Sequence, residues 1–150
     1  MDKVTKLYAK AFEADINIFN EYFHKTKKAA CLHKRPFKNI LIDKSKIEST
    51  CEEGILLAEE IGHYETGALY LMEDTFNMPV ARSNRIKCEA RAKHWSYEHY
   101  LSSDEIIHAI KSIGWNENEV AEQCEVTVEF LYRAIEYYAT KGIYFKFSYE

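Results

Sequence analysis

The middle of the chain carries the stretch Leu57-Ala58-Glu59-Glu60-Ile61-Gly62-His63-Tyr64. If this stretch is helical, Glu59 and His63 lie four residues apart on one face, one turn above the other. That spacing lets two side chains bind one metal ion. Glu60 is rotated by about 100°, close enough to hold a water molecule without binding the metal itself. Gly62 has no side chain, so a second element can approach closely beside this face.

The spacing is that of the H-E-x-x-H metallopeptidase helix, with glutamate in the first ligand position. A zinc site with an open coordination position needs a third protein ligand, usually from a later helix. The next long helix offers Glu89, followed at helical spacing by the small residues Ala92 and Ser96. Small residues in line with a carboxylate suit a helix that packs tightly against the first one.

The same residues also have an ordinary interpretation. Neighbouring glutamates such as Glu59 and Glu60 are common on solvated helix faces, and Glu89 has Arg85 and Lys93 four residues away as surface ion-pair partners. The metal interpretation therefore depends on whether the two segments meet in space.

Outward from this stretch, hydrophobic periodicity predicts α and β elements in separate parts of the chain. Three short strands are expected after a first helix over 4–14, and they lie at 16–18, 29–32 and 40–42. The second helix is expected to begin at Ser45 or at Thr50, where Thr50-Cys51-Glu52-Glu53 fits a capping box, and to end at Gly67. Helices then follow over 81–101, 104–113, 117–123 and 128–140. The alternating aromatic stretch 143–149 predicts a terminal strand, which closes the sheet within one chain or pairs between chains.

Composition sets the broad class. The chain has 150 residues, of which 47% are hydrophobic, 14% aromatic and 29% charged, with only five glycines and two prolines. These values exclude a disordered or low-complexity protein. No hydrophobic run approaches the roughly 20 residues that span a bilayer, and the first residues lack a signal-peptide core. The four cysteines form no C-x-x-C pair, so we expect free thiols in a cytoplasmic protein without a membrane partner.

The run Leu57 to Tyr64, followed downstream by Lys87-Cys88-Glu89-Ala90-Arg91-Ala92-Lys93-His94-Trp95, resembles the ImmA/IrrE metallopeptidases. It is most similar to the phage and prophage branch, in which E-E-x-G-H-Y and E-x-R-A-x-x-W recur. The resemblance implies an α+β fold over residues 1–101: a zincin-like core with a small antiparallel sheet and metal-binding helices. An acidic helical region with a terminal strand is then expected over residues 102–150.

By the same resemblance, Glu59, His63 and Glu89 are the expected zinc ligands and Glu60 is the general base of peptide hydrolysis. Many members of the family have histidine at the position of Glu59. Two carboxylates and one neutral histidine balance the charge of a divalent ion, and such oxygen-rich sites also accept manganese or iron. The expected substrate is a regulatory protein, a helix-turn-helix repressor of a phage or mobile element.

Two alternatives remain open at this stage. In the first, the fold is retained as a catalytically weak or inactive interaction module, with Glu59 marking a degraded site. In the second, the chain contacts nucleic acid through the segment 24–46, which has eight basic residues and one acid, Asp43.

For the peptidase interpretation, the strand at 29–33 is our expected substrate-binding rim, since an extended peptide can add to a sheet edge.

The C-terminal segment 116–138 has the spacing of a DNA-binding helix-turn-helix. Its charge argues against that function, because residues 102–140 contain eight acidic residues against Lys111 and Arg133. A net charge of −6 over this segment repels phosphate. We therefore predict no direct nucleic-acid binding here and expect the segment to cover the core or contact a protein.

Overall fold

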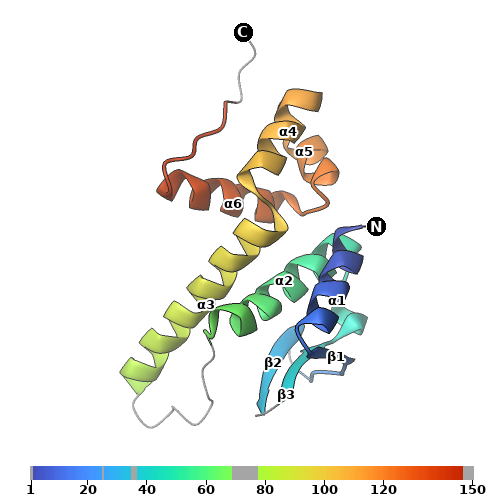
Figure 1. The fold of residues 1–150 in the computed structure, drawn as a ribbon, viewed down its shortest axis with the longest axis vertical. Helices are drawn as coiled ribbons and strands as arrows, with labels where there is room; N and C mark the ends of the chain where they lie inside the picture. The colour runs from blue at the N-terminus through green and yellow to red at the C-terminus, as the bar shows by residue number, and fades with distance from the viewer. Residues whose placement is uncertain (1, 25, 35–36, 69–77, 147–150) are drawn as a thin grey trace.

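The structure is a computed structural model that describes residues 2–24, 26–34, 37–68 and 78–146. Within these residues the chain is α+β, with six α-helices and one small sheet, as the coarse fold class predicted. Figure 1 shows the sheet with α1 and α2 at one end of the molecule, α4, α5 and α6 at the other, and the long α3 linking them. The helices are α1 (Lys3–Glu13), α2 (Thr50–Thr66), α3 (Met78–Tyr100), α4 (Ser103–Ile113), α5 (Glu117–Gln123) and α6 (Val128–Thr140).

The sheet contains the three expected strands, β1 (Ile16–Asn20), β2 (Ala29–Lys34) and β3 (Phe37–Ile42). Their order is β1-β3-β2, with β2 antiparallel and β1 parallel to the central β3. The expectation of an antiparallel sheet was therefore wrong, since the sheet is mixed. Alternation and β-branched residues reveal where strands lie, but the direction of pairing depends on the path of the segment between β1 and β2.

Helix α2 lies against the sheet, and its N-cap residue is one position earlier than in the predicted capping box. Ser49, not Thr50, is the N-cap residue, and its hydroxyl accepts a hydrogen bond from the N–H of Glu52 at 3.1 Å. The motif Ser49-Thr50-Cys51-Glu52 has the same S/T-x-x-E form as the neighbouring frame, so the sequence pattern alone does not separate them. The predicted end is confirmed, because Gly67 adopts φ 67° as the C-terminal cap.

The four later helices lie where periodicity predicted them, within a few residues at each end. The predicted terminal strand is wrong over 143–146, which is irregular, and its remainder at 147–149 lies outside the described residues. After Gly142, at φ 78°, the N–H of Ile143 donates to the carbonyl of Tyr138 at 2.9 Å. Phe145 packs edge-to-face on the Tyr138 ring. The segment therefore folds back on α6 instead of reaching the sheet.

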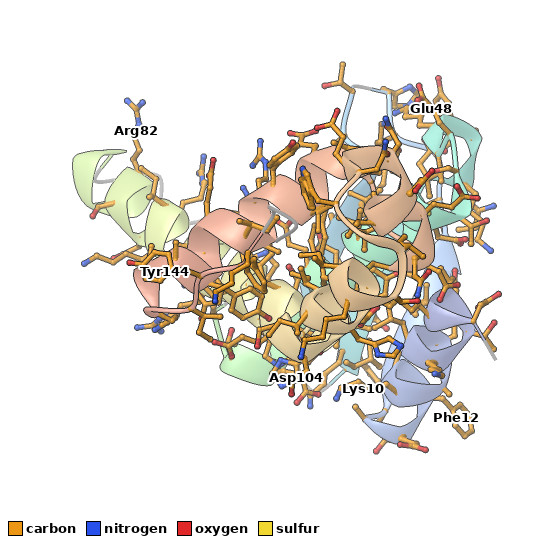
Figure 2. All side chains as sticks on the ribbon, turned by 90° about the horizontal axis from the view of Figure 1, so that it is seen from above. Lys10, Phe12, Glu48, Arg82, Asp104 and Tyr144 are labelled. Atoms are coloured by element: carbon orange, nitrogen blue, oxygen red, sulfur yellow. The ribbon has the colours of Figure 1, made fainter. Side chains whose placement is uncertain are left out.

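One hydrophobic core runs through the molecule, from α1 and the sheet to α6. Ile40, Ile42, Leu57 and Ile61 are fully buried where α2 covers the sheet. At the other end, Tyr138 donates through its hydroxyl to main-chain carbonyls at the end of α3. Figure 2 shows Arg82, an exposed residue in the N-terminal part of α3, pointing away from the body. No helix of the described residues is both long and apolar enough to span a membrane.

Candidate metal centre

His63 lies in the last turns of α2 and is 5% exposed. Its Nδ1 is 2.7 Å from the carbonyl oxygen of Ala68, just beyond the left-handed turn at Gly67. Because Nδ1–H donates to this carbonyl, Nε2 is the nitrogen turned toward α3, where it lies 3.6 Å from Oε1 of Glu89. Metal-binding histidines are held in this way, with one nitrogen donating to a main-chain oxygen and the other facing the ion.

The structure brings together the three residues that the sequence nominated as ligands. One ligand atom from each of Glu59, His63 and Glu89 lies within 4.8 Å of the other two. Ligand atoms about 2.0–2.1 Å from a tetrahedral ion are themselves roughly 3.3 Å apart. The three atoms would therefore have to move somewhat closer together to bind one ion. Two helices supply the set, α2 the first two residues and α3 the third.

The three residues of this cluster shift one another's pKa values. Burial, a hydrogen bond with Glu89 and the nearby Glu60 raise the pKa of Glu59 to about 7, although Lys93 acts in the opposite direction. Burial alone would lower the pKa of His63, but Glu89, the carbonyl of Ala68 and Glu60 together raise it to about 9. Without an ion, the carboxylates are thus stabilised by protons. A divalent ion with the same three ligands would replace those protons.

Glu60 points from α2 toward strand β2. The thiol of Cys31 donates to Oε2 of Glu60 at 3.0 Å and also lies 3.2 Å from its main-chain carbonyl. Burial is the main cause that raises the pKa of Glu60. Burial and the Glu60 charge raise the pKa of Cys31 well above its usual range, so this thiol is a neutral hydrogen-bond donor. Glu60 is therefore held beside the ligand cluster by a contact from the sheet.

The close packing of α2 and α3 depends on Gly62. A Cβ at this position would lie 2.7 Å from the main-chain oxygen of Ala92 and 3.3 Å from its Cα. Ala92 and Ser96 are almost completely buried along the same face of α3. The expected close approach beside the metal face is confirmed, and it is this approach that brings Glu89 to His63.

Tyr64 and the other histidines near this site have structural contacts of their own. The hydroxyl of Tyr64 accepts from the N–H of Asn39 at 2.9 Å and also contacts the carbonyls of Asn39 and Leu32, so it ties α2 to the sheet. Of the other described histidines, none joins the three-residue cluster. His94 stacks on Tyr137 and His99 on Trp95.

Sequence reasoning missed two groups of this site, the Cys31 thiol and the Ala68 carbonyl. A signal for the first was present, since alternation along β2 places Ala29 and Cys31 on the same face, opposite Ile42 and Ile40 of β3. Those isoleucines are fully buried beneath α2, and Cys31 therefore also faces α2. The carbonyl of Ala68 carries no residue-specific signal, because any residue after the Gly67 turn has one.

Some lysines of the basic segment 24–46 pair with acidic groups of the chain itself. Lys28 pairs with Glu52 at 2.6 Å and Lys46 with Asp43 at 3.3 Å. Lys46 also donates to the carbonyl of Phe23. These contacts give several of the lysines a structural role.

At the opposite end of the molecule, the exposed acidic residues of α5 and α6 remain directed to solvent, among them Glu119, Glu122, Glu129 and Glu136. Comparison with known proteins adds no further assignment: no protein-family model, no curated protein and no solved structure matches the chain.

Proposed function

We propose that the chain is a zinc-dependent endopeptidase with a zincin-like core, and that its substrate is a regulatory protein of the helix-turn-helix repressor class. The observation that carries the proposal is the convergence of Glu59, His63 and Glu89 from two helices, with ligand atoms within 4.8 Å. A carboxylate of raised pKa beside these residues, Glu60, supplies the base that such a reaction needs.

The donor set fits a divalent ion. Two carboxylates and one histidine, whose Nδ1 is occupied by the Ala68 carbonyl, are acceptable zinc ligands and leave an open coordination position. When bound, the ion would polarise the scissile carbonyl and acidify the attacking water. Manganese or iron would also suit this oxygen-rich set.

Residues of the chain itself would supply the proton transfer and hold the site in place. Glu60 accepts the proton of the attacking water and delivers it to the leaving amine. Cys31 donates to Oε2 of Glu60, which fixes the carboxylate and leaves its other oxygen for the water. His63 and Glu89 hold α2 and α3 at the spacing that the cluster requires.

The substrate would lie along β2. This strand has β3 on one side only, so its other side is an edge of the three-stranded sheet. Its residue Cys31 contacts Glu60, so an extended peptide hydrogen-bonded to this edge would run close to the base.

The test combines metal analysis with proteolysis. The protein is stripped with a chelator and reloaded with zinc. It is then incubated with a small helix-turn-helix repressor as the test substrate. We expect one bound ion per chain and discrete cleavage products. Glu60→Gln should keep the ion and lose cleavage, because Glu60 is the base and not a ligand.

Glu65→Gln is the matched control, since Glu65 is an exposed carboxylate on the same helix. Cleavage that persists in Glu60→Gln, or a wild-type chain that retains no ion, would contradict the proposal. A repressor that is bound but not cleaved by the zinc-loaded protein would identify an interaction module instead. Salt-dependent duplex binding abolished by reversing the charge of Lys34, Arg35 and Lys38 would identify the nucleic-acid alternative.

A further inference from the structure

A cavity of about 240 Å³ opens beside Glu59, between α2, α3 and α6. This volume is below the roughly 300–1,000 Å³ of small-molecule pockets, and it matches one amino-acid side chain better than a free metabolite. Glu59 is one of its walls as well as a member of the metal cluster. Whatever occupies the cavity is therefore a direct neighbour of the metal position.

One part of the cavity wall is apolar. Ile55 of α2 and Phe130 of α6 line it together with the ring of Tyr97. Phe130 is 6% exposed and packs against Tyr97 at a ring-centroid distance of 5.3 Å. These side chains can contact the aliphatic part of a bound amino-acid side chain, but they cannot form an ion pair with its charged end.

The remaining walls are polar: Lys93 of α3 and Arg133 of α6 are cationic, Glu129 of α6 is anionic, and Ser96 and Thr127 supply hydroxyl groups. Arg133 pairs with the exposed Glu129 at 2.8 Å and hydrogen-bonds the hydroxyl of Tyr97. Among the described residues, Lys93 forms no ion pair within 4.0 Å. If Glu59 binds the proposed ion, the other charges of the cavity are Lys93 and Arg133 against Glu129, which leaves a net positive charge.

We infer that this cavity is a substrate subsite for an acidic side chain, glutamate above all, at a position flanking the scissile bond. The inference rests on the proposed endopeptidase function. The stem of the residue contacts Ile55 and Phe130, and its carboxylate is paired by Lys93 and Arg133. Arg133 thereby gives α6 a role in the site, which no motif of the sequence indicated.

A second hollow lies beside the cavity and shares three of its lining residues. This larger hollow of about 710 Å³ between α3 and α6 shares Tyr97, Glu129 and Arg133 with the cavity and adds the aromatic residues His94, Tyr132 and Tyr137. The peptide beyond the acidic residue therefore has a surface to follow along α3 and α6.

The experiment reads binding as well as cleavage. Zinc-loaded Glu60→Gln is immobilised and used to enrich a random peptide library, and the wild-type enzyme cleaves the same library. We expect glutamate or aspartate at one fixed position, enriched about tenfold over the library, which corresponds to about 1.4 kcal/mol. Lys93→Glu combined with Arg133→Glu should reverse the preference to lysine or arginine at that position.

Lys87→Glu combined with Lys111→Glu is the control, because both lysines are exposed and neither lines the cavity. It should leave the preference unchanged. Metal binding and cleavage without any acidic preference, or a preference unaffected by the charge reversal, would overturn the inference and leave the proposed function intact. Acidic preference in binding without wild-type cleavage would overturn the proposed function and retain the subsite.

Discussion

Nε2 of His63 lies 3.6 Å from Oε1 of Glu89, and this contact joins α2 to α3 at the candidate metal centre. The third member of the cluster, Glu59, is one helical turn before His63 and shares a hydrogen bond with Glu89. The cluster thus contains two carboxylates and one histidine, whereas an H-E-x-x-H helix with a third glutamate supplies two histidines and one carboxylate. With a neutral histidine, this ligand set balances the charge of a divalent ion.

The substitution Glu59→His tests the role of this charge. A second imidazole leaves a divalent ion with more of its positive charge, so bound water becomes more acidic and softer nitrogen ligation favours zinc. We expect roughly tenfold tighter zinc binding in a chelator competition titration and a lower pH optimum of peptide hydrolysis. Glu65→His, on the exposed face of α2, should change neither quantity. The same affinity and pH profile in Glu59→His and the wild type would contradict this account.

The crossing of α2 and α3 depends on a single missing side chain. Gly62→Ala gains helix propensity worth about 1 kcal/mol, but its Cβ would lie 2.7 Å from the main-chain oxygen of Ala92. Because a main-chain atom cannot rotate away, the helices must separate. We expect a net loss of about 1–3 kcal/mol in the free energy of unfolding by urea and weaker zinc binding.

Gly142→Ala gives the comparison for Gly62. It has open space around the added methyl group but a φ of 78°, so its cost is local strain far from the cluster. This variant should be destabilised and bind zinc normally. If Gly62→Ala also bound zinc normally, the spacing of α2 and α3 would not control the site.

The sequence was sufficient for the elements of the site but not for the contacts that orient them. Glu59 and His63 follow from spacing because helical periodicity is a local property, and Gly62 with Ala92 indicates that two helices approach. The set of three with Glu89 was what the family resemblance implied. The parallel pairing of β1 with β3, by contrast, is set by the path of a loop. The roles of Cys31 and Arg133 depend on which elements become neighbours only in the folded chain.

The buried carboxylate of Asp43 gives a pH dependence of stability. It lies at the end of β3, is 2% exposed, and accepts hydrogen bonds from the N–H groups of Phe23 at 2.9 Å and Ser45 at 3.1 Å. These hydrogen bonds, with the Ser45 hydroxyl and Lys46, lower its pKa to about 2.

A group with a lowered pKa in the folded state stabilises the fold above its unfolded pKa and loses this contribution as pH falls through its folded pKa. The contribution of Asp43 is therefore complete above about pH 5 and decreases toward pH 2. Asp43→Asn should be less stable than the wild type near pH 6, and the difference should shrink on acidification, as measured by urea unfolding at each pH. Asp104→Asn, at an exposed position on α4, is the control. A difference that stays constant from pH 6 to pH 2 would show that the ionised carboxylate is not what these hydrogen bonds require.

The hydrogen bond from Cys31 to Glu60 separates positioning of the base from binding of the ion. Cys31→Val keeps the size and the apolar contacts of the β2 residue but removes the donor, while Cys31→Ser keeps a hydroxyl donor at the same place. A hydrogen bond to a charged group contributes about 1.5–3 kcal/mol, so its loss in the reactive complex corresponds to a decrease of roughly tenfold or more in kcat. Because Cys31 contacts Glu60 and not the ligand cluster, zinc affinity should be the same in all three proteins.

We therefore expect low kcat in Cys31→Val and partial recovery in Cys31→Ser. Both values come from steady-state cleavage of the repressor, with zinc affinity measured in parallel. A large loss of zinc affinity in Cys31→Val would instead mean that β2 supports the ligands themselves, and equal kcat in all three proteins would mean that Glu60 is positioned by α2 alone.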